Sequence, residues 1–279
     1  MRCVMLWGFI FISTSVLASD YHSARTDGLG GAGHAGPMLN DAIYLNPSFE
    51  SFLPTYSFAF NYNWYHGGDT QPDGSSYVHG HGANASVQDG RSEMFQAGVA
   101  ASQTESAQMI HLGASKSIIK QLGVGMGAKM IFPNQGDPIT RDATFSVSGV
   151  IDQMFQAVLV IDNILEPNPG SLGMYREVIL GTKINIMGIL LFYIDPHYVG
   201  NLNPHWGHES GVELTIMKDL FFRGGLFLNS QIPFEATRGN GYSFGIGWLS
   251  PRMSLDGAIT SVIQPVNATN FSTGITLYF

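Results

Sequence analysis

The chain has 279 residues, of which 12% are charged and 12% aromatic, and its formal net charge is −8. The acidic balance argues against a surface for nucleic-acid phosphates, and the sole cysteine, Cys3, excludes intrachain disulfides and cysteine metal sites. No stretch after residue 18 has 18 uncharged apolar residues, which argues against membrane-spanning helices. A closed β-barrel satisfies its backbone without such runs, so the composition favours an outer-membrane barrel of the Gram-negative type.

Residues 1–18 have the pattern of a secretory signal peptide. Arg2 precedes an apolar run that extends to Leu17, and Ala18 supplies the small residue that a signal peptidase requires. We therefore expect the mature chain to begin at Ser19. An uncleaved anchor is the alternative, but the apolar run is short for a spanning helix.

A glycine-rich segment follows the predicted signal peptide. Residues 25–48 contain too much glycine for a strand or a long helix. A flexible linker is one alternative, but residues 40–45 suit a short helical turn with Asn40 or Asp41 as its cap. We therefore predict a small folded segment at residues 19–55.

The rest of the chain, residues 56–279, repeatedly alternates apolar and polar residues, which is typical of membrane-spanning strands. The clearest case runs from Tyr56 to Trp64, where every second residue is aromatic. The pattern predicts an all-β fold: a transmembrane antiparallel β-barrel of about fourteen strands. Twelve is the alternative, because 75–87 and 252–262 have the weakest patterns. The strands are expected at 56–65, 75–87, 93–101, 108–117, 122–132, 143–151, 153–162, 175–185, 188–196, 208–217, 220–229, 240–250, 252–262 and 269–279.

Long polar connections alternate with tight turns along this series, and with an even strand count both barrel ends lie on the periplasmic side. A charge that faces the lipid midplane costs about 2–4 kcal/mol, so charged strand residues should face the lumen. Arg223 shares a face with Phe221 and Phe227, which predicts a position near a rim or at a bulge. The charged residues expected on the lumen face are Lys129, Glu177, Lys183, Glu213 and Asp256.

The chain ends in an amphipathic strand whose last residue is Phe279. Phe271, Ile275 and Leu277 share its face, while Ser272 lies on the other. This ending resembles the signal that the barrel-assembly machinery reads in bacterial outer-membrane proteins. We therefore expect that machinery as a partner, together with outer-membrane lipid and lipopolysaccharide.

The glycine-rich segment resembles the start of FadL-like outer-membrane transport proteins, which carry a glycine-rich run, then Asp-Ala, then Asn-Pro-Ala. Ser48 stands here in place of the last alanine. The resemblance implies that residues 19–55 fold as a hatch inside a fourteen-stranded barrel, residues 56–279. The matching residues are Gly28, Gly30, Gly31, Ala32, Gly33, Asp41, Ala42, Asn46 and Pro47.

The resemblance implies passive uptake of small hydrophobic molecules such as long-chain fatty acids. In that family a kinked strand opens a side gap, and strand 75–87 with Gly80 and Gly82 is the candidate here; a bulge or a misplaced loop is the alternative. Gly123, Gly125 and Gly127 could likewise thin the wall. PorV-type relatives work in secretion, so the alternative function is a non-transporting surface or secretion-partner barrel. A general polar pore is a third possibility.

Histidines 79 and 81 share a strand face, and others lie between His197 and His208. The spacing permits two histidines to bind one metal ion, but no acidic residue or third ligand supports such a site. We therefore interpret these histidines as solvated residues at the barrel rim. His111 is taken as a lipid-interface residue. No window groups a nucleophile, a base and an orienting group, so we expect no enzyme, catalytic residue, cofactor or metal.

Overall fold

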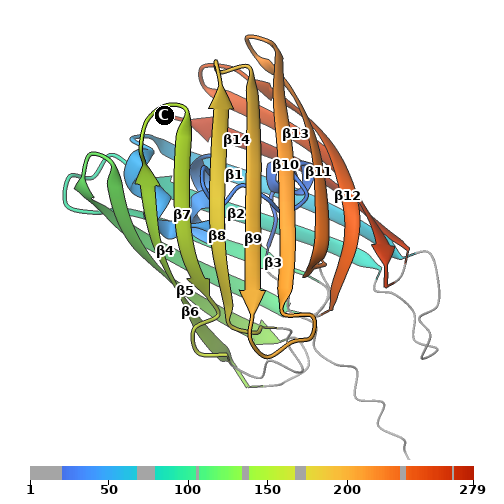
Figure 1. Ribbon diagram of the computed structural model, residues 1–279. Helices are drawn as coiled ribbons and strands as arrows, with labels where there is room; N and C mark the ends of the chain where they lie inside the picture. Colours follow the sequence, from blue (N-terminus) through green and yellow to red (C-terminus); the bar gives the residue numbers. More distant parts are fainter. Residues whose placement is uncertain are drawn as a thin grey trace, which may run out of the picture.

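The computed structural model describes residues 21–67, 79–104, 107–133, 138–166, 174–232, 237–265 and 267–279. Its strands form one closed antiparallel barrel in which each strand pairs with the next and β1 pairs with β14 (Figure 1). The prediction of fourteen strands is confirmed, and the alternative of twelve is wrong. The first seven strands are β1 (Tyr56–Gly67), β2 (Gly80–Asp89), β3 (Gln96–Gln103), β4 (Ala107–Ile119), β5 (Leu122–Pro133), β6 (Thr140–Val150) and β7 (Phe155–Asp162). The others are β8 (Glu177–Ile186), β9 (Leu190–Val199), β10 (Trp206–Met217), β11 (Leu220–Gln231), β12 (Arg238–Leu249), β13 (Met253–Gln264) and β14 (Ala268–Tyr278).

The barrel is apolar outside and largely polar inside. In β1 the side chains of Phe58, Phe60 and Trp64 are exposed on the outer face, whereas Asn61 and Asn63 are buried in the lumen. The five charged residues expected in the lumen are buried or half-buried there. No helix among the described residues is long and apolar enough to cross a membrane.

Two expectations about individual side chains are wrong. Arg223 and Phe227 are both buried in the lumen, with 6% and 3% of their surface exposed. Arg223 pairs in regular register with Glu213, so its place requires neither a rim nor a bulge. His111 is also buried and faces the lumen, because β4 alternates with the opposite phase to the one assumed.

The N-terminal segment lies inside the barrel, drawn in blue in Figure 1. We call its described part, residues 21–55, the hatch. It contains α1 (Ala24–Gly28), η1 (Leu39–Asp41), α2 (Ala42–Leu45) and η2 (Pro47–Phe52). The Ser23 side chain caps α1 by accepting from the Thr26 N–H at 3.2 Å.

The expected helical turn is present as η1 and α2, and Asp41 is at the cap position as expected, although its side chain does not make the capping bond. Asp41 occupies the N-cap position of α2 without a side-chain capping bond, and its carboxylate instead accepts from the Thr26 hydroxyl at 3.4 Å. The Asn40 side chain accepts from the Ser57 hydroxyl of β1 at 2.7 Å. Both side chains thus form hydrogen bonds to other segments and do not cap the helix.

The two ends of the barrel sheet meet at the β1–β14 seam. The backbone N–H of Phe279 donates to the Tyr56 carbonyl at 3.0 Å. In the lumen, the Asp27 carboxylate of α1 accepts from Asn63 of β1 at 3.2 Å and from Asn270 of β14 at 2.8 Å. One hatch residue therefore bridges the first and last strands.

Candidate functional site

The hatch approaches the barrel wall backbone to backbone at its glycines. Gly30 has φ of 69°, and a Cβ there would lie 2.8 Å from the Leu226 nitrogen of β11. A Cβ on Gly225 would collide with Leu29 and Gly30, and one on Gly28 would lie 3.1 Å from the Gly245 Cα. Glycine is therefore required on both sides of this contact. Gly31 and Gly33 also have positive φ, 88° and 133°.

Asn46 and Pro47 anchor the second half of the hatch. Asn46 is fully buried, and its amide donates to the His34 carbonyl and the Ser148 hydroxyl, both at 2.8 Å. The Ser48 hydroxyl donates back to Asn46 Oδ1 at 2.6 Å. Asn46 and Ser48 thus lie at a wall contact with β6, while Pro47 lies against the glycines of β5.

The inward glycines of β5 make room for η2. A Cβ on Gly125 would collide with Pro47 and Ser48, and one on Gly123 would lie 2.6 Å from the Ser51 hydroxyl. A Cβ on Gly127 would lie 3.2 Å from Pro47 Cγ. Close contact with the hatch therefore explains why these positions are glycine, and no kink in the strand is needed to explain them.

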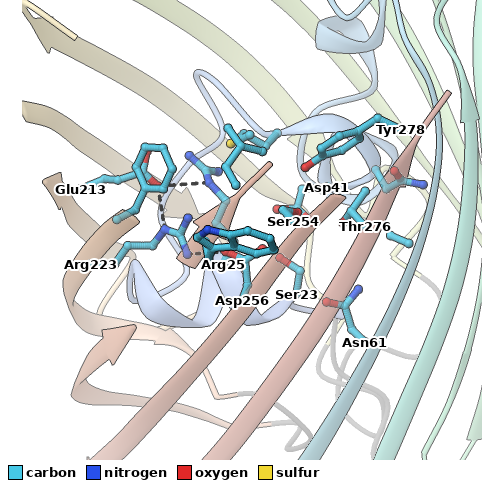
Figure 2. A pocket seen from close by; sticks show the side chains of 16 residues that line it. Ser23, Arg25, Asp41, Asn61, Glu213, Arg223, Ser254, Asp256, Thr276 and Tyr278 are labelled. Atoms are coloured by element: carbon cyan, nitrogen blue, oxygen red, sulfur yellow. Dashed lines mark hydrogen bonds and ion pairs between the residues drawn. The ribbon is translucent and has the colours of Figure 1, made fainter. Parts of the chain in front are cut away.

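An ion-pair network joins α1 to β10, β11 and β13 (Figure 2). Glu213 lies 3.4 Å from the Arg25 Nε and 2.6 Å from the Arg223 Nε, and Arg223 also donates to Asp256 at 2.6 Å. Arg25 donates to the Tyr193 hydroxyl at 2.9 Å as well. Burial lowers the pKa of Arg25, but the negative charge of Glu213, together with smaller effects of Tyr193, Asp41 and Asp256, outweighs burial and raises the pKa. The network borders a cavity of about 40 Å³.

Asp41 lies at the edge of the same cavity (Figure 2). Its burial raises the pKa of the carboxyl to about 6, against the opposing effect of Arg25. Its proton occupancy therefore changes near neutral pH.

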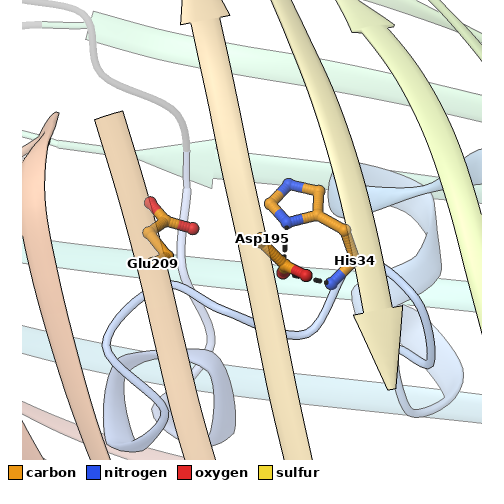
Figure 3. Close-up of side chains that lie close together, drawn as sticks. All are labelled: His34, Asp195 and Glu209. Carbon is orange, nitrogen blue, oxygen red and sulfur yellow. Dashed lines mark hydrogen bonds and ion pairs between the residues drawn. The ribbon is translucent and has the colours of Figure 1, made fainter. Parts of the chain in front are cut away.

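His34 connects the hatch to β9 (Figure 3). Asp195 Oδ2 accepts from the Gly33 N–H at 2.7 Å and the His34 N–H at 3.0 Å, and lies 3.0 Å from the His34 Nδ1. Burial lowers the pKa of His34, but the hydrogen bond and charge of Asp195, together with the charges of Glu209 and Glu177, outweigh burial and raise the pKa to about 9. Sequence reasoning missed this contact because it weighed only histidines that are close to one another along the chain.

Glu50 is buried in η2 with neither carboxylate oxygen hydrogen-bonded among the described residues. Burial raises the pKa of its carboxyl to about 8. The folded state therefore keeps a proton that the unfolded state loses near pH 4.5. A group whose folded pKa is raised makes the free energy of unfolding fall as pH rises, here between about 4.5 and 8.

We expect Glu50→Gln to remove this fall. The variant should match the parent chain below pH 4.5 and exceed its free energy of unfolding by about 3–5 kcal/mol above pH 8, at 1.36 kcal/mol per pKa unit. Urea unfolding at pH 4.5 and pH 9 measures the difference. Glu93→Gln, in the exposed β2–β3 turn, is the matched control. A gain that is equal at both pH values would contradict the argument.

Gly80 and Gly82 lie at the start of β2. They pair with Tyr65 and Asn63 of β1, whereas pairing of β2 with β3 begins only at Ala83. The β2–β3 seam joins seven residue pairs, against ten between β1 and β2. A hollow of about 440 Å³ lies across this seam. It is lined by residues of β1 to β5, among them Phe60, Ala83, Ala85, Ala101, Ile110 and Phe132.

Lumen-facing residues form the inner side of this hollow. Asn84 and Ser102 are Cα partners across the seam, are 1% and 4% exposed, and are joined by an amide-to-hydroxyl bond of 2.8 Å. Met109 of β4 lies beside them in the lining. The Asn84–Ser102 hydrogen bond thus joins β2 to β3 at the inner side of the hollow.

Neither a protein-family model nor a curated protein matches the sequence. Solved structures do match. The CymD monoaromatic hydrocarbon channel has a TM-score of 0.66 at 10% identity over 95% of this chain and 98% of that chain. The Ralstonia pickettii toluene transporter TbuX has a TM-score of 0.64 at 9% identity, over 93% of this chain and 98% of that chain. A Pseudomonas aeruginosa FadL homologue has 0.62 at 11% identity over 95% of this chain and 99% of that chain.

At these identities the likeness shows the fold. The resemblance of the glycine-rich segment to FadL-like proteins is thereby confirmed for the architecture as a whole. The chain has the fold of a FadL-like barrel, with its N-terminal helical segment inside the lumen.

Proposed function

We propose that this protein is an outer-membrane channel for the passive entry of small hydrophobic molecules. Residues 1–18 direct export, Phe279 presents the assembly signal, and residues 19–55 act as a hatch that moves during transport. The ligand leaves sideways between β2 and β3. The hatch residues in this proposal are Gly28, Gly30, Gly31, Gly33, Asp41, Asn46 and Pro47, and Gly80 and Gly82 begin the strand at the side exit.

Two features support this proposal. The described cavities beside the hatch are small, and a larger apolar hollow lies at the β2–β3 seam. Three cavities lined by described hatch residues measure about 10, 40 and 50 Å³. An apolar cavity of about 150 Å³ binds benzene, and these three are much smaller, so we expect none of them to hold a hydrocarbon while the hatch is seated. The external hollow of about 440 Å³ is large enough. A lateral route into lipid suits an apolar ligand, whereas a polar solute would need a water-filled lumen.

Monoaromatic hydrocarbons are the preferred ligand class in this proposal. Two of the similar structures are described as a monoaromatic hydrocarbon channel and a toluene transporter. The connections on the side of the barrel away from Phe279 are short, the longest being 14 residues between β7 and β8. Family members that carry long-chain fatty acids have larger loops there, so a compact aromatic ligand fits better.

Uptake by cells tests the function. We expect Gram-negative cells that express the full chain to take up radiolabelled toluene several-fold faster than cells with an empty vector. Uptake of a labelled disaccharide should not change. A variant lacking residues 21–53 should admit the disaccharide, because its lumen is no longer filled.

Correct insertion is checked by heat-modifiable migration on gels. Toluene uptake at the vector rate by a correctly inserted full chain would refute transport of this ligand class. A disaccharide rate that stays low in the deletion variant would refute the role of residues 19–55 as the plug.

A further inference from the structure

Three side chains with metal-binding atoms meet where the hatch touches β9 and β10. His34 comes from the hatch, Asp195 from β9 and Glu209 from β10, and Figure 3 shows the Glu209 carboxylate turned toward the other two. Each can place one ligand atom within 4.8 Å of the ligand atoms of the other two. All three residues are buried.

The two carboxylates oppose each other directly. Asp195 and Glu209 are Cα partners in the β9–β10 ladder and face the lumen together. Like charges directly opposite on neighbouring strands are destabilising, and burial increases the cost of each charge. Protonated His34 supplies at most one positive charge against two negative ones. A divalent cation bound with neutral His34 would balance both carboxylates.

Unpaired oxygens point to the same conclusion. Asp195 Oδ2 accepts three hydrogen bonds, whereas Oδ1 has no partner among the described residues. Glu209 Oε1 accepts from the Ser230 hydroxyl, and its Oε2 likewise has no described partner. A buried carboxylate oxygen without a partner is destabilising, because it has lost its hydrogen bonds to water and gained none. Each carboxylate therefore keeps one oxygen free for a ligand.

There is space for a cation beside these residues. A cavity of about 50 Å³ is lined by His34 and Glu209 and extends to His197, whose Nε2 has no hydrogen-bond partner among the described residues. This volume holds at least one water molecule in addition to an ion. Water can thus complete the coordination shell that three protein ligands leave open.

We propose that His34, Asp195 and Glu209 bind one divalent transition-metal cation of the Zn²⁺ type, which links the hatch to β9 and β10. An imidazole with two carboxylates suits Zn²⁺ better than Ca²⁺ or Mg²⁺, which prefer oxygen ligands alone. Bonds of about 2.0–2.2 Å require the three ligand atoms to move closer together than 4.8 Å. The flexible Glu209 side chain can make that movement, and one proton leaves His34 when the ion binds.

Metal content of the intact barrel tests the site. The full-length protein, purified from membranes and stripped with EDTA, is incubated with ZnCl₂, desalted and analysed by elemental mass spectrometry. We expect one Zn²⁺ per chain, retained in excess Ca²⁺ and Mg²⁺. His34→Gln, Asp195→Asn and Glu209→Gln should each lower the retained Zn²⁺ at least tenfold. Co²⁺ should give visible absorption bands that Glu209→Gln abolishes.

The control variant is His79→Gln/His81→Gln, which removes two histidines outside the proposed site and should retain the full Zn²⁺ content. Circular dichroism and heat-modifiable migration check that each variant is folded. Zn²⁺ that survives all three substitutions, or that disappears with His79 and His81, is an adventitious ion only and overturns the proposal. The result does not depend on transport, so failure of the metal site and failure of the channel function are separable.

Discussion

Glu213→Gln is expected to lower the free energy of unfolding by about 3–5 kcal/mol, because it leaves two buried guanidinium groups without their shared carboxylate. Arg25 and Arg223 both contact Glu213, and among the described residues only Asp256 would remain in an ion pair with Arg223. Urea unfolding in detergent measures the loss. Because Arg25 belongs to the hatch, we also expect higher ion conductance in planar bilayers.

The matched control is Glu166→Gln, which weakens an ion pair at the barrel rim. Glu166 lies 3.5 Å from Arg176, whose side chain is 52% exposed. Exposed ion pairs contribute about 0–1 kcal/mol, so the control should change the free energy of unfolding by less than about 1 kcal/mol. If Glu213→Gln costs no more than Glu166→Gln, the buried network does not hold the hatch.

A disulfide across the β2–β3 seam is expected to reduce toluene uptake at least tenfold. Asn84→Cys/Ser102→Cys places two cysteines at directly opposed inward positions. Opposed Cα atoms in antiparallel strands are about 4.5–5.5 Å apart, which fits a disulfide. Oxidation should stop uptake, and a reductant should restore it, because the covalent bond prevents the strands from separating.

The control crosslink is Val147→Cys/Leu159→Cys at the β6–β7 seam, which joins only six residue pairs. Oxidation there should leave toluene uptake unchanged. Inhibition by this crosslink but not by the first would place the exit at β6–β7. Inhibition by neither would mean that the ligand leaves along the barrel axis.

The barrel could be predicted in detail because successive side chains of a spanning strand face lipid and lumen in turn, so apolar and polar residues alternate along the strand. Tyr56 to Trp64 alternate between lipid and lumen with no interruption, and each of the fourteen strands overlaps its predicted range. The errors arose where an aromatic residue was taken as lipid-facing. Phe227 faces the lumen, where it packs with Ile232 and Val262, so an aromatic side chain alone does not fix the phase of a strand.

The contacts of the hatch could not be predicted in the same way. His34 and Asp195 are 161 residues apart, and Arg25 and Glu213 are 188 apart, so no local pattern connects them. The glycine-rich motif predicted that a segment folds ahead of the barrel. It could not show that the motif glycines exist to meet Gly225 and Gly245 of the wall, because those partners belong to strands whose relative position only the closed barrel defines.

Asp27 bears on the order in which the barrel is completed. It is synthesised before either strand that it bridges, yet it holds the amides of Asn63 and Asn270 on the two sides of the seam. We therefore expect the hatch to favour pairing of the last strand with the first. The hatch thus joins the two ends of the barrel sheet from inside the lumen, and a barrel that lacks it loses two hydrogen bonds that span the seam.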